Sequence, residues 1–152
     1  MSFISCRPAM AGSGLMILVH GYHPVADEDY LNTPNVGATM GPTAIRKALQ
    51  LAYTSDLSMF HVHLHHHRGR TEFSQIDISE SKRFVPDFFN VRPDLPHGAL
   101  VVSLNSATGL CWMPNNGGIK RIDHFVEVGR PMRWFGTIAD RAMQAMKALV
   151  AK

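Results

Sequence analysis

Residues 57–67 read LSMFHVHLHHH, and five of these eleven positions are histidine. Polar and apolar side chains alternate with a period of two between Leu57 and Leu64, which is typical of a β-strand whose successive side chains point to opposite faces. The odd-numbered side chains, His61, His63 and His65 among them, are expected on one face and the apolar even-numbered ones on the other. A histidine-bearing strand is therefore predicted at the centre of the chain.

The segments before this strand predict two further strands and a helix. Phe3–Cys6 is short and apolar, Gly12-Ser-Gly14 is a turn signal, and Leu15–His20 (LMILVH) is predicted to be a buried strand. Gly41-Pro42 opens a helix, because proline is tolerated in the first turn. That helix has one apolar face, formed by Ala44, Ile45, Ala48, Leu49 and Ala52.

The segments after the histidine-bearing strand also predict helices interleaved with strands. A polar loop runs to Ser74, and a helix is predicted to start after Asp77 or Ser79 and to stop at Pro86. The later elements are a buried strand at Ala99–Leu104, strands at Leu110–Met113 and Ile122–Val128 around the turn Asn115–Gly118, and a final helix at Ile138–Val150. We expect one α+β (α/β-like) domain over residues 1–152, a single mixed sheet flanked by helices.

Composition excludes several classes of function. The formal charge of +3 comes from scattered Lys and Arg residues, so no nucleic-acid partner is expected. The longest apolar run, Leu15–Val19, is too short to span a bilayer, and the N-terminus lacks the pattern of a signal peptide. We expect a cytoplasmic protein without a membrane partner. Cys6 and Cys111 are predicted to be buried free thiols.

The histidine run predicts a divalent-metal site, with zinc as the expected ion. Side chains at i and i+2 of a strand lie on one face, so two imidazoles can converge on one ion, and Asp77 on the next element can supply a third ligand. Three protein ligands and a water are the pattern of catalytic zinc. The competing interpretation is a set of half-exposed histidines on a sheet face without any metal.

Two histidines spaced by one residue, a short loop and then Ser-x-x-Asp resemble the motif of the JAB/MPN (JAMM) metalloproteases. The stretch 61–112 is similar to bacterial JAB-domain proteins, some of them fused to or encoded beside E1-like adenylating domains, and the resemblance extends over most of residues 15–130. It implies a JAB/MPN (cytidine deaminase-like) architecture. It also implies a zinc hydrolase that cleaves a peptide or isopeptide bond, often at the tail of ubiquitin or a ubiquitin-like protein.

The resemblance assigns roles to individual residues. Asp77 matches the zinc-binding aspartate, and Ser74 matches the serine that hydrogen-bonds within the site and helps to hold the oxyanion. The histidine pair has two registers. His63/His65 requires one inserted residue before Ser74, and His65/His67 requires one deleted residue. The His63/His65 register fits the strand pattern better, and the other stays open.

The general-base glutamate of that family has no counterpart at its usual place on an early strand, because residues 1–26 contain no Glu. Three explanations remain open. The usual position falls before Met1, or the base is lost, or the first available acids, Glu28 or Asp27, substitute for it. Loss of a general base costs roughly 10²–10⁴-fold in rate and leaves metal binding possible.

The sequence therefore leaves three functions to be weighed. The first is a zinc-dependent (iso)peptidase that acts on a ubiquitin-like or small-protein modifier, with an E1-like adenylating protein as a possible associate. The second is a catalytically inactive JAB-like binding module. The third is a protein that sequesters metal with its surface histidines, which predicts several loosely bound ions instead of one tightly held ion.

Overall fold

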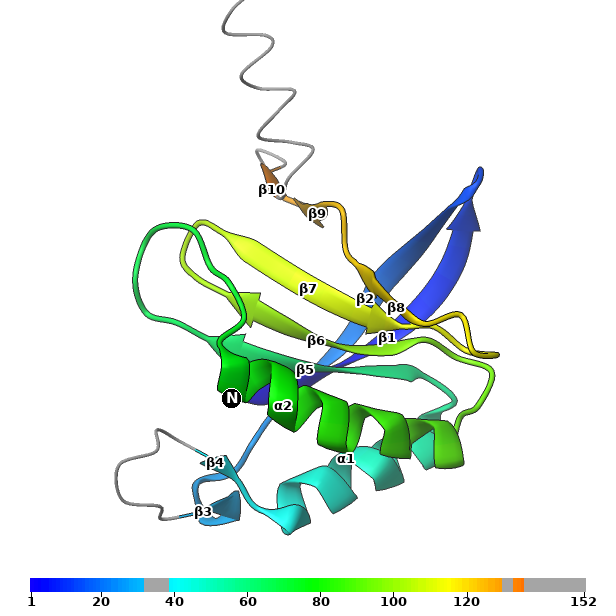
Figure 1. Cartoon of the computed structure of the whole chain (residues 1–152), viewed down its shortest axis with the longest axis vertical. Coiled ribbons are helices and arrows are strands. Elements are labelled where there is room, and N and C mark those ends of the chain that lie inside the picture. Colours follow the sequence, from blue (N-terminus) through cyan, green and yellow to red (C-terminus); the bar gives the residue numbers. More distant parts are fainter. Residues whose placement is uncertain (32–38, 130–132, 136–152) are drawn as a thin grey trace, which may run out of the picture.

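A six-stranded mixed sheet with two helices forms the body of this α+β chain (Figure 1). The structure is a computed structural model that describes residues 1–31, 39–129 and 133–135. The strands of the main sheet are β1 (Ser2–Ala11), β2 (Gly14–Pro24), β5 (Ser58–Leu64), β6 (His97–Val102), β7 (Ala107–Trp112) and β8 (Ile119–Arg121). Their spatial order is β2-β1-β5-β6-β7-β8.

The remaining elements connect and cover this sheet. The helices are α1 (Pro42–Ser55) and α2 (Gln75–Phe84), and the 3-10 segments are η1 (Asp27–Asp29) and η2 (Val85–Asn90). Two small sheets pair β3 (Tyr30–Leu31) with β4 (Thr39–Met40) and β9 (Phe125–Glu127) with β10 (Arg133–Phe135). Within the main sheet β5 and β6 are parallel and joined through α2, and the other neighbours are antiparallel.

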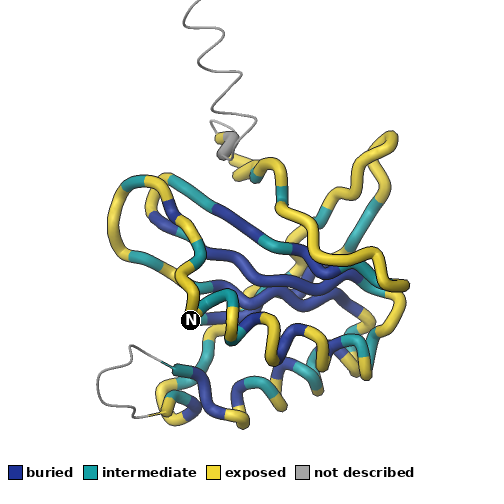
Figure 2. The backbone as a smooth tube through the Cα atoms, in the orientation of Figure 1, coloured by how far each residue is buried: buried dark blue, intermediate teal, exposed yellow. Residues whose placement is uncertain are grey.

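The alternation of β5 gives the two faces of the sheet different partners, as predicted. Met59 contributes to a core with Phe3 and with three buried alanines of α1, and Figure 1 shows both helices on one side of the sheet. Phe60 and Val62 face a second cluster on the opposite side. Buried backbone in Figure 2 is concentrated along the central strands. Both faces of β5 are therefore enclosed over its first five residues.

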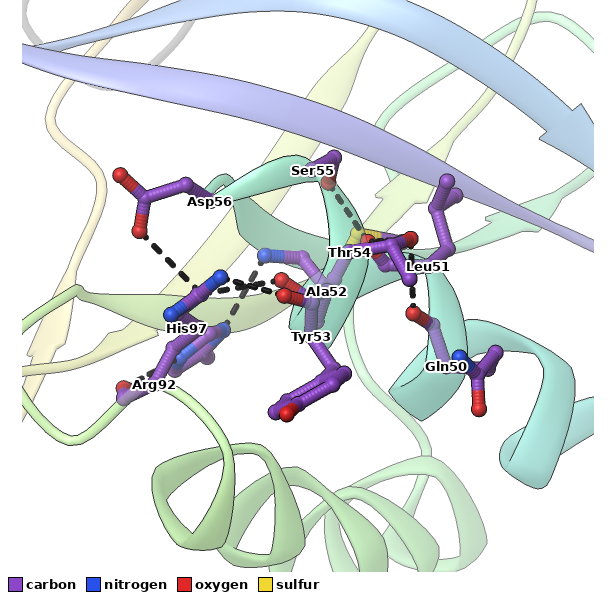
Figure 3. A network of polar contacts seen from close by, with 10 residues as sticks. Gln50, Leu51, Ala52, Tyr53, Thr54, Ser55, Asp56, Arg92 and His97 are labelled. Atoms are coloured by element: carbon purple, nitrogen blue, oxygen red, sulfur yellow. Dashed lines mark hydrogen bonds and ion pairs between the residues drawn. The ribbon is translucent and has the colours of Figure 1, made fainter.

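The start of β5 is anchored by His97 and Arg92 (Figure 3). The Met59 N–H donates to His97 Nδ1 at 3.1 Å, and His97 Nε2 donates to the Arg92 carbonyl at 3.1 Å. The Arg92 guanidinium donates to the carbonyls of Ala52 and Tyr53 at the end of α1. These bonds satisfy carbonyls that a helix terminus otherwise leaves unpaired.

Leu15–His20 is a strand, as predicted, but the prediction that it is buried is wrong. β2 is the edge of the sheet, and most of its residues are exposed. An apolar run predicts a strand enclosed on both faces, yet the sequence alone does not state which strands flank it. β2 is therefore an apolar strand that is exposed at the edge of the sheet.

Two other predicted boundaries shift. Helix α2 begins at Gln75 with Ser74 as its N-cap, earlier than the start predicted after Asp77 or Ser79. The strand predicted at Ile122–Val128 is reduced to the short β9, and the strand that follows the turn, β8, ends before that range begins. The turn at 115–118 is confirmed, since Asn115, Asn116 and Gly118 adopt positive φ between β7 and β8. The helix predicted at Ile138–Val150 lies outside the described residues.

Candidate functional site

His63 and Asp77, fourteen residues apart in the chain, meet where the end of β5 faces the start of α2. His63 Nδ1 lies 2.8 Å from Asp77 Oδ1, and the two side chains are 29% and 16% exposed. The odd-numbered alternation of β5 directs His63 toward the helix side, where α2 presents its first turn. The structure therefore brings together two of the residues predicted to bind a metal.

Ser74 and Asp77 form a capping box at the N-terminus of α2. The Asp77 N–H donates to Ser74 Oγ at 3.1 Å, and the Ser74 N–H donates to Asp77 Oδ2 at 2.8 Å. Such reciprocal bonds satisfy two of the free N–H groups at a helix start. The Ser-x-x-Asp pattern thus has a structural role whether or not it also serves a metal.

Burial works to raise the pKa of the Asp77 carboxyl, but the hydrogen bonds from Ser74 and His63 outweigh burial and leave that pKa below its ordinary value. Asp77 is consequently a carboxylate at neutral pH. An ionised carboxylate with one oxygen on a helix cap and the other on an imidazole is held in a single orientation. That orientation presents Oδ1 to the histidine-bearing strand.

His65 and His67 continue from His63 as a row of imidazoles. The His63 and His65 rings stack at a centroid distance of 4.7 Å, and the His65 and His67 rings lie 5.1 Å apart. Burial and the neighbouring imidazoles lower the pKa of His65, so its ring is neutral and able to bind a metal at neutral pH. His67 Nδ1 lies 3.1 Å from the carbonyl of Arg68, away from Asp77.

His61 lies deeper, between Phe3 and Phe84, with ring centroids at 5.5 and 5.4 Å. Its Nε2 is buried and has no hydrogen-bond partner among the described residues. Burial, with a smaller contribution from the adjacent His63, lowers the pKa of His61 to about 3. This imidazole is therefore neutral, and it places an unsatisfied polar atom beside the His63–Asp77 pair.

A pocket of about 200 Å³ opens in front of these groups. His61, His63, Asp77 and Glu80 supply polar side chains, and Met1, Met40, Phe73 and Phe84 are among the apolar ones. Such a mixture of apolar walls and a few convergent polar groups is typical of small-molecule and peptide sites.

Glu28 is placed elsewhere by the structure. It lies exposed on η1, next to Asp27, and neither residue is among those lining the pocket. Glu80, one turn after Asp77 on α2, lines the pocket instead and pairs with Arg83 at 2.8 Å. Glu80 was not predicted from the sequence, and His61 was placed on the same strand face as His63 without being assigned a ligand role. The helical spacing of three residues from Asp77 could have indicated Glu80, but only with the correct start of α2.

The donor set matches a zinc site in part. Two ligands of one tetrahedral zinc with bonds of about 2.0–2.1 Å are separated by about 3.3 Å, so the 2.8 Å contact between His63 and Asp77 needs only a small opening to admit the ion. In the described parts of the chain, however, no group of three or more His, Cys, Asp or Glu side chains is arranged to hold a metal. The residue types fit, and two of the three predicted ligands are adjacent.

Comparisons with protein-family models, curated proteins and solved structures found no match for this chain. Among the described residues, no helix combines the length and the apolar character needed to cross a membrane. The residues of the site and their geometry are therefore the basis on which a function can be proposed.

Proposed function

We propose that this chain is a cytoplasmic zinc-dependent peptidase or isopeptidase of the JAB/MPN (JAMM) type, acting on a ubiquitin-like or small-protein modifier. The observation that carries the proposal is the contact of 2.8 Å between His63, at the end of a histidine-bearing strand, and Asp77, in a Ser-x-x-Asp helix cap. In the His63/His65 register both residues would be zinc ligands, so their contact supports the proposal in that register.

The order of elements supports the same proposal. A long β-hairpin, helix α1, the strand β5 that bears the histidines, and a helix that starts with the capping box follow one another along the chain. An E1-like adenylating protein remains a proposed associate. The pocket beside His63 and Asp77 has a volume of about 200 Å³ and largely apolar walls, which suit the last residues of a peptide tail.

His63, His65 and Asp77 would hold the ion, with His67 replacing His63 in the other register. Two imidazoles and a carboxylate form a known ligand set of catalytic zinc. When bound, zinc lowers the pKa of a coordinated water and polarises a carbonyl oxygen. Ser74 fixes the orientation of Asp77 through the capping box, and Glu80 is the second carboxylate at the pocket.

A second candidate is a JAB-like module that binds a partner without cleaving it. It is favoured by the position of Glu28, which is exposed on η1 and outside the pocket. Under this proposal the pocket binds a peptide tail, and no peptidase activity appears in zinc-loaded protein.

The experiment that tests the first proposal is elemental analysis of the purified protein and of Asp77→Ala, together with cleavage of fusions that carry a ubiquitin-like tail. One zinc per chain, lost in Asp77→Ala and accompanied by chelator-sensitive cleavage, supports the peptidase. One zinc per chain without cleavage supports the binding module. Absence of zinc, or tight one-to-one zinc retained in Asp77→Ala, contradicts the site.

A further inference from the structure

The outer edge of β2 is apolar and exposed along most of its length. Among the residues that the structure describes, β2 pairs with β1 alone, and the backbone groups on its other side have no strand partner there. Large apolar side chains are well exposed along it, namely Leu15 at 39%, Met16 at 43%, Leu18 at 45%, Val19 at 64% and Tyr22 at 59%. Long exposed apolar edges are sites where further strands add.

Half of this hairpin extends beyond the sheet. β1 pairs with β5 only over Ser2–Cys6, whereas its pairing with β2 continues to Ala11 and Gly14. Figure 1 shows the hairpin leaving the other strands on the side away from α1 and α2. A two-stranded hairpin alone is at best marginally stable in water. The projecting half is expected to gain stability from a further strand.

The two edges of the main sheet are protected very differently. At the opposite edge, β8 has three residues, two of which are Lys120 and Arg121, and short charged strands discourage pairing. Residues 14–24 of β2 contain no Asp, Glu, Lys or Arg, and proline occurs only at the final position. Leu15–Val19 has the high β-propensity and lack of charge that promote strand association.

The exposure of neighbouring residues on β2 indicates what kind of partner fits. Leu18 and Val19 are adjacent in the strand, so their side chains point to opposite faces, and both are exposed. A helix packed on one face would cover only one of them and leave the backbone edge open. A strand added at the edge contacts both faces and also accepts and donates the outward hydrogen bonds.

We propose that β2 pairs antiparallel with β2 of a second copy of this chain and thus forms a two-fold dimer with one continuous sheet. An uncharged edge offers nothing that would select a partner of opposite charge. It does match itself, because antiparallel self-pairing places apolar residues opposite apolar residues and brings no like charges together. A two-fold axis also closes the assembly, since each copy contributes the same edge.

The test is sedimentation velocity of the full chain over a wide concentration range. We expect the mean mass to rise toward twice that of one chain, and Leu18→Lys to shift the midpoint at least tenfold toward higher concentration. Leu104→Lys is the matched control, because Leu104 is also an exposed leucine, at 61%, but lies in the loop after β6. The mean mass of Leu104→Lys should depend on concentration in the same way as that of the unsubstituted chain.

If Leu18→Lys fails to fold, amide hydrogen exchange of the unsubstituted chain still tests the dimer. In the unsubstituted chain, the amides of β2 that do not face β1 should exchange more slowly as concentration rises, while the amides of β8 should not change. A monomer at all concentrations contradicts the proposal. A dimer unaffected by Leu18→Lys contradicts it as well. Neither result bears on the His63–Asp77 site.

Discussion

His63 Nδ1 and Asp77 Oδ1 are 2.8 Å apart, although thirteen residues of loop and helix separate them in the chain. The contact links the end of β5 to the first turn of α2. The other oxygen of Asp77 accepts the Ser74 N–H, so one carboxylate serves a helix cap and an imidazole at once. Substitutions that separate these two roles are therefore informative.

Ser74→Ala should remove the cap and leave the metal ligands in place. We expect the free energy of unfolding to fall by about 1 kcal/mol, the usual cost of losing an N-cap serine. Zinc content should stay near that of the unsubstituted chain. Urea denaturation and elemental analysis of the same sample measure both effects. Ser79→Ala, an exposed serine within α2, is the control and should lower neither quantity, because alanine favours a helix interior. Complete loss of zinc in Ser74→Ala would contradict this division of roles.

The two histidine registers differ in which single substitution is tolerated. In the His63/His65 register, His63→Ala should abolish zinc binding and His67→Ala should not, because His67 lies one ring further from Asp77. Zinc titration of the two variants with a competing chelator measures this directly. The reverse result would select the His65/His67 register. Equal partial losses in both variants would instead favour several loosely bound ions on the histidine run.

Glu80 lines the pocket and Glu28 does not, so the two residues are expected to differ in their effect on catalysis. We expect Glu80→Gln to lower kcat by about 10²-fold or more, the range of general-base effects. Glu28→Gln should leave kcat unchanged. Cleavage of a modifier-tail fusion by zinc-loaded protein is the measurement, with zinc content checked for each variant. A strong effect of Glu28→Gln alone would restore the original assignment of that residue.

His97 should make the protein less stable in acid. Burial lowers the pKa of His97 from 6.5 to about 4, against the opposing effect of its backbone hydrogen bonds. The unfolded chain therefore binds a proton before the folded chain does. Stability from this group is complete above pH 6.5 and is lost as the pH falls toward about 4, at about 1.4 kcal/mol per pH unit.

The variant His97→Phe keeps an aromatic ring beside Phe88 and Phe89 but removes both hydrogen bonds. We expect a loss of about 1–3 kcal/mol at pH 7, because the Met59 N–H becomes unsatisfied. Its stability should also fall less steeply between pH 6.5 and 4. Denaturant titrations at several pH values measure both. His66→Gln, at an exposed histidine, should retain the steep profile. An unchanged slope in His97→Phe would contradict the assignment.

Gly98 should tolerate no side chain. A Cβ there would lie 2.3 Å from the Leu110 carbonyl oxygen and 2.4 Å from the Phe60 ring, both of which are held within the sheet. Gly98→Ala is expected to destabilise the fold by about 1–3 kcal/mol or more through overpacking. Gly14→Ala meets only an ordinary contact at 3.5 Å and should change stability little. Thermal unfolding compares the two, and equal melting temperatures would contradict the prediction.

The sequence predicted local structure well where one physical signal dominated. Alternation in residues 57–64 predicted β5 and its two faces, and Gly41-Pro42 predicted the start of α1. The start of α2 was predicted too late because Ser74, Asp77 and Ser79 are all plausible caps, and only the reciprocal bonds of Ser74 and Asp77 distinguish them.

The features that could not be predicted from the sequence depend on contacts between elements that are distant in the chain. The exposure of β2 follows from strand order, which an apolar run does not encode. The proximity of His63 and Asp77 was expected only in the His63/His65 register, and the structure shows a contact between them, whereas the place of Glu80 depends on the phase of α2. The choice between His63/His65 and His65/His67 as ligands stays a prediction.

Binding of an ion and folding of the first turn of α2 are thermodynamically coupled, because both involve the carboxylate of Asp77. An ion bound between His63 and Asp77 would restrain the same side chain that holds the first turn of α2, so it would also oppose fraying of that helix. Reciprocally, the capping box orients the ligand before the ion arrives and lowers the entropy lost on binding. Fraying at the start of α2 should thus be accompanied by a modest loss of metal affinity, although the ligands themselves stay in place and the site still fills at saturating zinc.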